Sequence, residues 1–352
     1  TGAIEIDNHT VMRGDYSGPQ AATIVLREPT VEYAVLETAR GGIMRRGLGF
    51  DECQVGVLLN IANDHLGEND IHTLDELARC KTVVIDAVSP EGTAVLNADD
   101  PLVLAGREWA RGKVIFFSLD NDSAPVRQHV QAHGIAFTVH NECIVMRQGN
   151  VEASIISVVD TPITFEGHAR FNVANALAAS AVAYALGLSI ADIQLGLQTF
   201  HPTPGQNPGR TNFIDAGDIK VLIDYGHNVP ALKALSELVS RIPAQRRICV
   251  ASVPGNRRDE DLHSIGAQLA SMHDIVVLYE TDPRGRPDAE TVSLLRAGAE
   301  SVPGTSRVEV IMQERDAVDR AFSEARKGDL LVLLIDDFNS ATERLRGRRF
   351  LP

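Results

Sequence analysis

Two apolar runs, each followed at once by polar residues, constrain the fold of this chain more than any other feature. The first run covers residues 33–36 and leads into Glu37, and the second covers residues 55–61 and leads into a polar phrase that includes His65. Short apolar runs of this kind are typical of buried strands in a parallel sheet. Because ligands bind at the carboxyl ends of such strands, we expect Glu37 and His65 to lie side by side in one crevice.

Glu37 and His65 together suit a metal site. A carboxylate oxygen and an imidazole nitrogen can share a divalent cation with a phosphate-bearing ligand. Taken alone, each residue has a simpler interpretation, in which Glu37 is a solvated strand end and His65 caps the next helix. The occurrence of both residues, each directly after an apolar run, favours the metal site.

Between the two runs lies Arg40-Gly41-Gly42. A pair of glycines lets the backbone approach a ligand closely, and the arginine can hold an anion. A plain glycine turn with a solvated arginine is the simpler expectation.

Length and composition indicate a two-domain globular protein. The chain of 352 residues exceeds one average domain, and its 44% hydrophobic and 23% charged residues are usual for soluble proteins. The net charge of −14 argues against nucleic acid as a main partner, since phosphate backbones bind basic patches.

The four cysteines lack metal-site or disulfide spacing, which fits a reducing cytoplasm, and no apolar run is long enough to cross a membrane. The chain begins with Thr1 instead of methionine, which favours a cut N-terminus.

A segment rich in proline and glycine, residues 200–210, divides the chain. Such segments are typical of linkers, so we predict one domain over residues 1–208 and another over residues 209–352. The first domain has parallel strands and a β-meander between residues 137 and 158. After the linker the strand–helix alternation restarts, which predicts a second parallel sheet and an α/β fold.

Three polar residues on predicted helices are candidates for a site. Lys81 falls among the apolar positions of a helix that begins after Thr73, with Glu76 completing a capping box. A lysine that faces inward is costly unless it is paired, and the alternative is that its stem extends along the surface. Asn172 and Asn175, at the start of the helix over residues 173–186, share a helix face. Their amides suit base-edge hydrogen bonding, although capping is the simpler role for Asn172.

Several phrases of the sequence resemble the Mur ligase superfamily of ATP-dependent amide ligases. They occur in the family's order over nearly the whole chain, and the alternating strands and helices agree with that family's architecture. The phrases are GDYSGP at residues 14–19, LETARGG at 36–42, NIANDHLG at 60–67, LNADD at 96–100, NPGR at 207–210, DYGHN at 224–228 and GNRRDED at 255–261.

The resemblance implies a role for each matching residue. Residues 1–208 match a central ATPase domain, incomplete at its N-terminal end, and residues 209–352 match a Rossmann-like C-terminal domain. Glu37 and His65 match magnesium ligands, and Lys81 matches a lysine that often carries a carbamate. The nucleotide-binding positions of the family, including an arginine at the domain junction, match Asn172, Asn175, Arg210, Asp224, His227 and Asn228.

The resemblance also implies a reaction that uses ATP and Mg²⁺. A carboxylate forms an acyl phosphate, and an amino acid then displaces phosphate to leave an amide. The phrases are most similar to the branch that adds arginine to a poly-aspartate chain, so we expect a small amino acid and an acidic polymer as substrates. The family also suggests self-association. Two alternatives stay open: a ligase for another acid and amine, or a non-catalytic scaffold, because the sequence holds no Gly-x-x-Gly-Lys-Thr phosphate loop.

Overall fold

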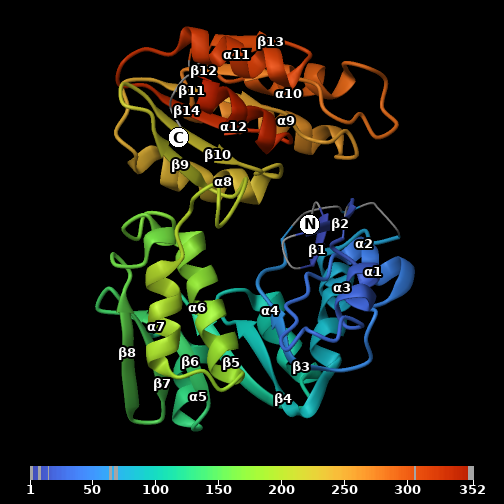
Figure 1. Cartoon of the computed structure of the whole chain (residues 1–352), viewed down its shortest axis with the longest axis vertical. Helices are drawn as coiled ribbons and strands as arrows, with labels where there is room; N and C mark the ends of the chain where they lie inside the picture. Colours follow the sequence, from blue (N-terminus) through green and yellow to red (C-terminus); the bar gives the residue numbers. More distant parts are fainter. Residues whose placement is uncertain are drawn as a thin grey trace. The chain divides into compact units, whose positions relative to one another are not determined.

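The computed structural model describes residues 3–6, 9–14, 16–62, 66, 70–304 and 307–347. The chain divides into two compact units (Figure 1). The first unit combines the residues up to Asp160 with Asn172–Leu197, and the second combines Thr161–Phe171 with the residues from Gln198 onward. The predicted domain border after residue 208 stays a prediction.

A six-stranded mixed sheet forms the centre of the first unit. Its first four strands are parallel, and the fourth also forms an antiparallel meander with the last two. This arrangement confirms the predicted combination of parallel strands and meander. In spatial order the strands are β3 (Cys53–Leu58), β4 (Val88–Asn97), β5 (Lys113–Ser118), β6 (Ile135–His140), β7 (Cys143–Gln148) and β8 (Val151–Ser157). A separate antiparallel pair is formed by β1 (Ala3–Ile6) and β2 (His9–Arg13).

Helices cover both faces of this sheet. Along β4, Ala94 and Leu96 point into one core and Val95 into the other, because successive side chains of a strand alternate. The first core is closed by α3 (Leu74–Asp86), α4 (Pro101–Ala105) and α5 (Ala124–Gln131). The second is closed by α6 (Arg170–Ala185) and α7 (Ile190–Thr199). Short 3-10 turns lie at Gly106–Trp109 and Pro162–Thr164.

The predicted start of α3 is confirmed by its cap. Thr73 precedes the helix with an extended backbone, and its side chain accepts a hydrogen bond from the Glu76 backbone N–H at 3.2 Å. The Glu76 carboxylate in turn accepts from the Thr73 N–H at 3.0 Å. Two N–H groups without helical partners are thus satisfied, which fixes where α3 begins.

The predicted strand over residues 33–36 is wrong. These residues form no strand, and the Tyr33 and Val35 side chains are 69% and 93% exposed. In the described part of the chain, β3 is the first strand of the sheet and pairs only with β4. An apolar run is buried as a strand only where a neighbouring strand and a covering helix exist, and the pattern alone cannot show that they do.

The expected glycine turn at residues 40–42 is also wrong. Residues Arg40–Arg46 form helix α2, which follows α1 (Pro19–Val25). A Cβ at Gly42 would lie 2.8 Å from the Pro19 side chain and 3.3 Å from the Gly18 backbone. The glycine therefore allows α2 to pack against the start of α1. Arg40, expected to be solvated, is only 9% exposed.

A second six-stranded sheet forms the centre of the second unit. Five of its strands are parallel, as the repeated strand–helix units predict. The strand at one edge is antiparallel to its neighbour and was not predicted, since it is short and has polar ends. In spatial order the strands are β13 (Arg307–Val310), β12 (Ile275–Leu278), β11 (Arg247–Ala251), β14 (Leu330–Leu334), β10 (Lys220–Asp224) and β9 (Asn212–Asp215).

Both faces of the second sheet are covered by helices (Figure 1). One face packs against α8 (Val229–Arg241), α9 (Asp259–Met272) and α10 (Glu290–Glu300). The other packs against α11 (Glu314–Glu324) and α12 (Phe338–Gly347). Burial on both faces explains why β14 is apolar at every position. In the described residues no helix is both long and apolar enough to cross a membrane.

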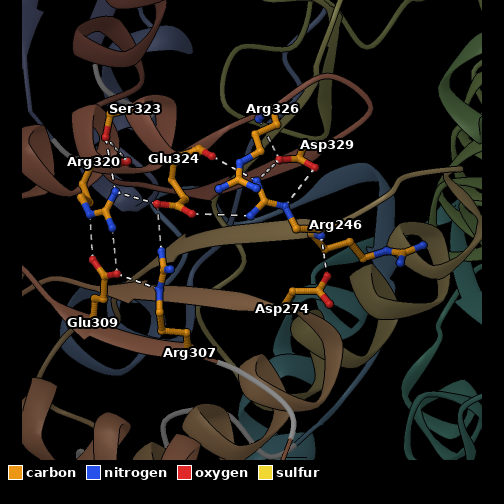
Figure 2. Close-up of polar contacts among 10 residues, drawn as sticks. Arg246, Asp274, Arg307, Glu309, Arg320, Ser323, Glu324, Arg326 and Asp329 are labelled. Atoms are coloured by element: carbon orange, nitrogen blue, oxygen red, sulfur yellow. Dashed lines mark hydrogen bonds and ion pairs between the residues drawn. The ribbon is translucent and has the colours of Figure 1, made fainter.

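An ion-pair network joins edge strand β13 to α11 near the amino ends of the strands (Figure 2). Arg320 donates to both carboxylate oxygens of Glu309, at 2.9 and 3.0 Å, and to Glu324 at 3.0 Å. Arg307 forms ion pairs with the same two carboxylates, at 2.9 and 3.0 Å. The two guanidinium groups lower the pKa of Glu324 to about 2. The predicted site residues of this unit, Arg210, Asp224, His227 and Asn228, lie away from this network, beside β9 and β10.

Candidate functional site

Asp224, at the carboxyl end of β10, is a fixed anchor in the second unit. Its carboxylate accepts hydrogen bonds from the Thr211 backbone N–H at 2.8 Å, the Thr211 hydroxyl at 3.0 Å and the Gly226 N–H at 2.7 Å. These bonds hold the turn that carries Arg210 against the end of the strand. Asp224 therefore positions its neighbours in this structure, and its predicted contact with nucleotide stays a prediction.

Arg210, Tyr225 and His227 lie together beside this anchor. The Arg210 Cζ atom is 5.2 Å from the centre of the Tyr225 ring, a distance suited to a cation–π contact. The His227 and Tyr225 ring centres are 4.8 Å apart, and His227 Nδ1 lies 2.9 Å from the Tyr225 carbonyl oxygen. The structure thus brings Arg210 from one phrase of the sequence, and Asp224 and His227 from another, into one cluster.

The charges around Tyr225 identify two further arginines that the sequence did not single out. Burial, followed by the negative charge of Asp336, raises the pKa of the Tyr225 hydroxyl. Arg284, Arg210 and Arg257 act in the opposite direction. Three guanidinium groups are therefore within electrostatic reach of one hydroxyl at the carboxyl edge of the sheet. We call this set, Arg210, Arg257 and Arg284, the arginine rim.

Arg257 and Arg284 follow two neighbouring strands of the sheet. Arg257 lies in the loop after β11 and is 6% exposed, whereas Arg284 lies in the loop after β12 and is exposed. Arg284 Nη1 donates to Asn256 Oδ1 at 3.4 Å, so the two loops touch. The available signal was the position of each arginine directly after a predicted strand. That signal does not distinguish them from solvated loop arginines.

Asn228 has a structural role in the fold. It is the N-cap of α8, and its side-chain oxygen accepts a hydrogen bond from the Ala231 N–H at 2.9 Å. Pro230 lies in the first turn of this helix, where its missing N–H costs nothing. The cap fixes where α8 begins, beside His227. A contact between Asn228 and nucleotide is not tested by this geometry.

Asn172 and Asn175 lie on one face of α6, as their spacing predicts. Asn175 Nδ2 donates to Asn172 Oδ1 at 3.2 Å. The expectation that Asn172 is a capping residue is wrong, because α6 begins at Arg170 and Asn172 lies inside its first turn. Asn172 is 5% exposed and Asn175 is exposed, so the second amide is the one open to a ligand.

Lys81 is half-buried in α3. Its charge and that of buried Arg40 both act on the Cys80 thiol, which brings Arg40 into the surroundings of Lys81. Burial outweighs these two cations and raises the pKa of Cys80. Arg40, which the sequence alone suggests to be solvated, is therefore a further functional candidate in this region.

The predicted metal ligands are only partly covered by the structure. Glu37 is exposed, between the residues expected to form a strand and the start of α2. His65 lies outside the described residues, so the predicted pairing of Glu37 with His65 stays a prediction. Among the residues that the structure describes, no three His, Cys, Asp or Glu side chains are grouped closely enough to hold a metal ion.

Family models match both units of the chain. Residues 2–183 match the Mur ligase middle domain, and residues 209–334 match the Mur ligase glutamate ligase domain. Cyanophycin synthetase from Crocosphaera subtropica is 40% identical over 349 residues, which cover 99% of this chain and 40% of that protein. The chain therefore spans about two fifths of the length of such curated relatives.

Two solved structures share the fold. E. coli FolC in complex with DHPP and ADP has a TM-score of 0.59 and 17% identity, covering 85% of this chain and 63% of its own. The bifunctional folylpolyglutamate synthase/dihydrofolate synthase from Yersinia pestis, solved with AMPPNP and Mn ion, has a TM-score of 0.56 and 18% identity, covering 85% and 62%. At these identities the likeness shows the fold alone. The family matches over both units establish that this chain belongs to the Mur ligase family.

Proposed function

We propose that this chain is part of an ATP-dependent amide ligase. The observation that carries the proposal is the arginine rim at the carboxyl edge of the second sheet, where Arg210 lies over the Tyr225 ring and Arg257 and Arg284 act electrostatically on the same tyrosine. Positive groups at such an edge suit phosphate and carboxylate ligands. Membership of the Mur ligase family supports the same chemistry.

The proposed reaction has two steps. A carboxylate oxygen of the acceptor attacks the γ-phosphorus of ATP, and ADP leaves with the electrons of the broken P–O bond, which gives an acyl phosphate. The amine nitrogen of an amino acid then attacks the acyl carbon. Phosphate leaves, the nitrogen loses a proton, and an amide remains. Both steps redistribute negative charge over phosphate oxygens, so the protein contributes mainly positioning and positive charge.

The cluster around Asp224 is proposed to bind the nucleotide. Arg210 is oriented by the Tyr225 ring and is exposed, which leaves its guanidinium available to a phosphate. His227 and Asn228 follow directly and would line the same ligand. In the first unit, the exposed amide of Asn175, which is bonded to the buried amide of Asn172, is proposed to contact the adenine.

Glu37 fits a hard divalent cation. Its carboxylate is exposed, in the segment that leads into α2. We propose Mg²⁺ held by Glu37 and His65, which when bound neutralises phosphate charge. Lys81 is proposed to carry a carbamate, which would convert a half-buried cation into an anion able to reach the metal.

The proposed substrates are arginine and a poly-aspartate chain, in the cytoplasm and in a self-associating protein. The support is the 40% identity with cyanophycin synthetase over nearly the whole chain. A Mur-type ligase with another acid and amine is the alternative on substrate. A non-catalytic scaffold is the second alternative, favoured by the absence of a Gly-x-x-Gly-Lys-Thr phrase from these residues.

The deciding experiment uses the whole gene product that contains this chain. It is incubated with Mg-ATP, an aspartate-bearing primer and single amino acids, and ADP release and the mass of the primer are measured. We expect both to increase with arginine. ADP release with another amino acid alone would support the alternative ligase. No ADP release with any amino acid, together with no binding of ADP, would leave the scaffold as the function.

A further inference from the structure

The Arg286 side chain joins the two loops that carry Arg257 and Arg284 of the arginine rim. It lies in the loop after β12 and reaches the loop after β11. Its Nε donates to the Gly255 carbonyl at 2.6 Å, and its Nη2 donates to the Arg257 carbonyl at 2.5 Å. Nη2 also donates to Asp259 Oδ1 at 2.6 Å. One side chain thus fixes two carbonyl groups of the neighbouring loop and the first residue of α9.

The main chain closes the same junction. The Gly255 N–H donates to the Asp282 carbonyl at 3.1 Å, and the Arg286 N–H donates to the Pro283 carbonyl at 3.0 Å. A Cβ at Gly255 would lie 2.1 Å from the Pro283 carbonyl oxygen. Only glycine therefore permits this approach of the two loops.

The bonds to carbonyl groups distinguish Arg286 from a surface ion pair. The Arg286 side chain is 18% exposed, whereas its acidic partners Asp259 and Glu290 are 68% and 42% exposed. Exposed ion pairs contribute little to stability. The carbonyls of Gly255 and Arg257, in contrast, are fixed by a planar fork of donors that a lysine cannot reproduce.

We propose that Arg286 is a positioning residue for the arginine rim, an inference that rests on the proposed ligase function. In this role Arg286 acts through the two loops and not by contact with substrate. It holds the backbone on both sides of Asn256, which accepts a hydrogen bond from Arg284, and it holds the carbonyl of Arg257. Without these bonds the rim loses its fixed geometry, and the phosphate or carboxylate groups that it binds are held more weakly.

The test uses the whole gene product with Arg286→Met and Arg286→Lys. Arg296→Met is the matched control, because Arg296 also forms a short ion pair, at 2.6 Å to Glu300, but on the exposed surface of α10. Hydrogen exchange is followed by mass spectrometry in peptides covering residues 253–259. The melting temperature and the kcat and KM for ATP and for the amino acid are measured in parallel.

We expect both Arg286 variants to exchange faster in residues 253–259, and the KM for ATP or the amino acid to rise about tenfold with a smaller change in kcat. The control should change neither value. A role limited to stability would lower the melting temperature and the amount of active enzyme, which lowers kcat at constant KM. That result, or full rescue of KM and exchange by lysine, would overturn the inference.

Failure of the proposed function gives a different result. A wild-type protein without ligase activity refutes the function, and the exchange comparison then still decides whether Arg286 orders the loop. Unchanged hydrogen exchange of residues 253–259 in Arg286→Met refutes the positioning role of Arg286, even where the ligase is active.

Discussion

The Arg210 guanidinium lies over the Tyr225 ring, with 5.2 Å between Cζ and the ring centre. The ring orients the cation without neutralising it, because the attraction comes from the π-electrons and not from a negative charge. A carboxylate at this place would compete with an anionic ligand. The contact therefore leaves Arg210 with its full charge for a phosphate or carboxylate.

We predict that the ring of Tyr225, and not its hydroxyl, supports activity. Tyr225→Phe keeps the ring and should leave the kcat/KM of the whole ligase nearly unchanged. Tyr225→Leu removes the cation–π contact and should lower kcat/KM about tenfold. Steady-state ADP release measures both variants. Equal losses in the two would show that the hydroxyl is needed and that the proposed role of the ring is wrong.

The sequence predicts the elements of this fold better than their arrangement. The run LLVLL of β14 indicates a strand buried on both faces, and the structure confirms it. The run over residues 33–36 has the same character and is exposed, because no described strand lies beside it. Strand order depends on which runs meet in space. Nothing local in the sequence places β14 between β10 and β11.

The site was predictable where one phrase carries several of its residues. Asp224, Tyr225, His227 and Asn228 are consecutive or nearly so, so one strand end brings them together. Arg257 and Arg284 reach the same edge from two other loops. Their approach depends on the Gly255–Pro283 contact and on Arg286, and neither follows from periodicity.

The α9–α10 pair predicts a sharp response to an added methyl group. A Cβ at Gly298 would lie 2.0 Å from the His263 carbonyl oxygen, so Gly298→Ala must separate the two helices. We expect a loss of about 2 kcal/mol or more in the free energy of unfolding, despite alanine's better helix propensity. Urea denaturation followed by circular dichroism measures the loss.

Gly196→Ala is the control for this prediction. Gly196 lies in α7 with open space where its Cβ would be, so alanine should stabilise the protein by about 0.5–1 kcal/mol. Similar effects of the two substitutions would mean that helix propensity, and not the close packing of α9 on α10, decides the outcome.

His273 predicts acid sensitivity in the second unit. Burial lowers its pKa to about 4, with a further contribution from Arg247, while Asp274 and the bond to the Leu269 carbonyl oppose the shift. Nδ1 lies 2.9 Å from that carbonyl oxygen, and Nε2 is buried with no partner among the described residues. The folded state therefore keeps the imidazole neutral.

The sign of the pH effect follows from this depressed pKa. Between about pH 6.5 and 4 the unfolded chain binds a proton at His273 that the folded chain does not, so stability falls as pH falls, by up to about 3 kcal/mol. His273→Asn keeps a donor for the Leu269 carbonyl and removes the titration. The difference in unfolding free energy between wild type and variant should shrink from pH 7.5 to pH 4.5. A constant difference would contradict the prediction.

The Arg246–Asp329 pair should contribute more stability than any exposed pair of the second unit (Figure 2). Arg246 donates to Asp329 at 2.6 and 3.3 Å, and the Asp329 side chain is 1% exposed. Asp329→Asn leaves the Arg246 charge beside a neutral amide and should cost about 2–4 kcal/mol. Asp218→Asn breaks an exposed pair with Lys327 and should cost less than about 0.5 kcal/mol.

Because salt screens exposed charges much more than buried ones, the cost of Asp329→Asn should persist in 0.5 M NaCl, about three times physiological ionic strength. A cost that vanishes with salt would show that the pair is solvated and that backbone bonds alone hold this corner of the sheet.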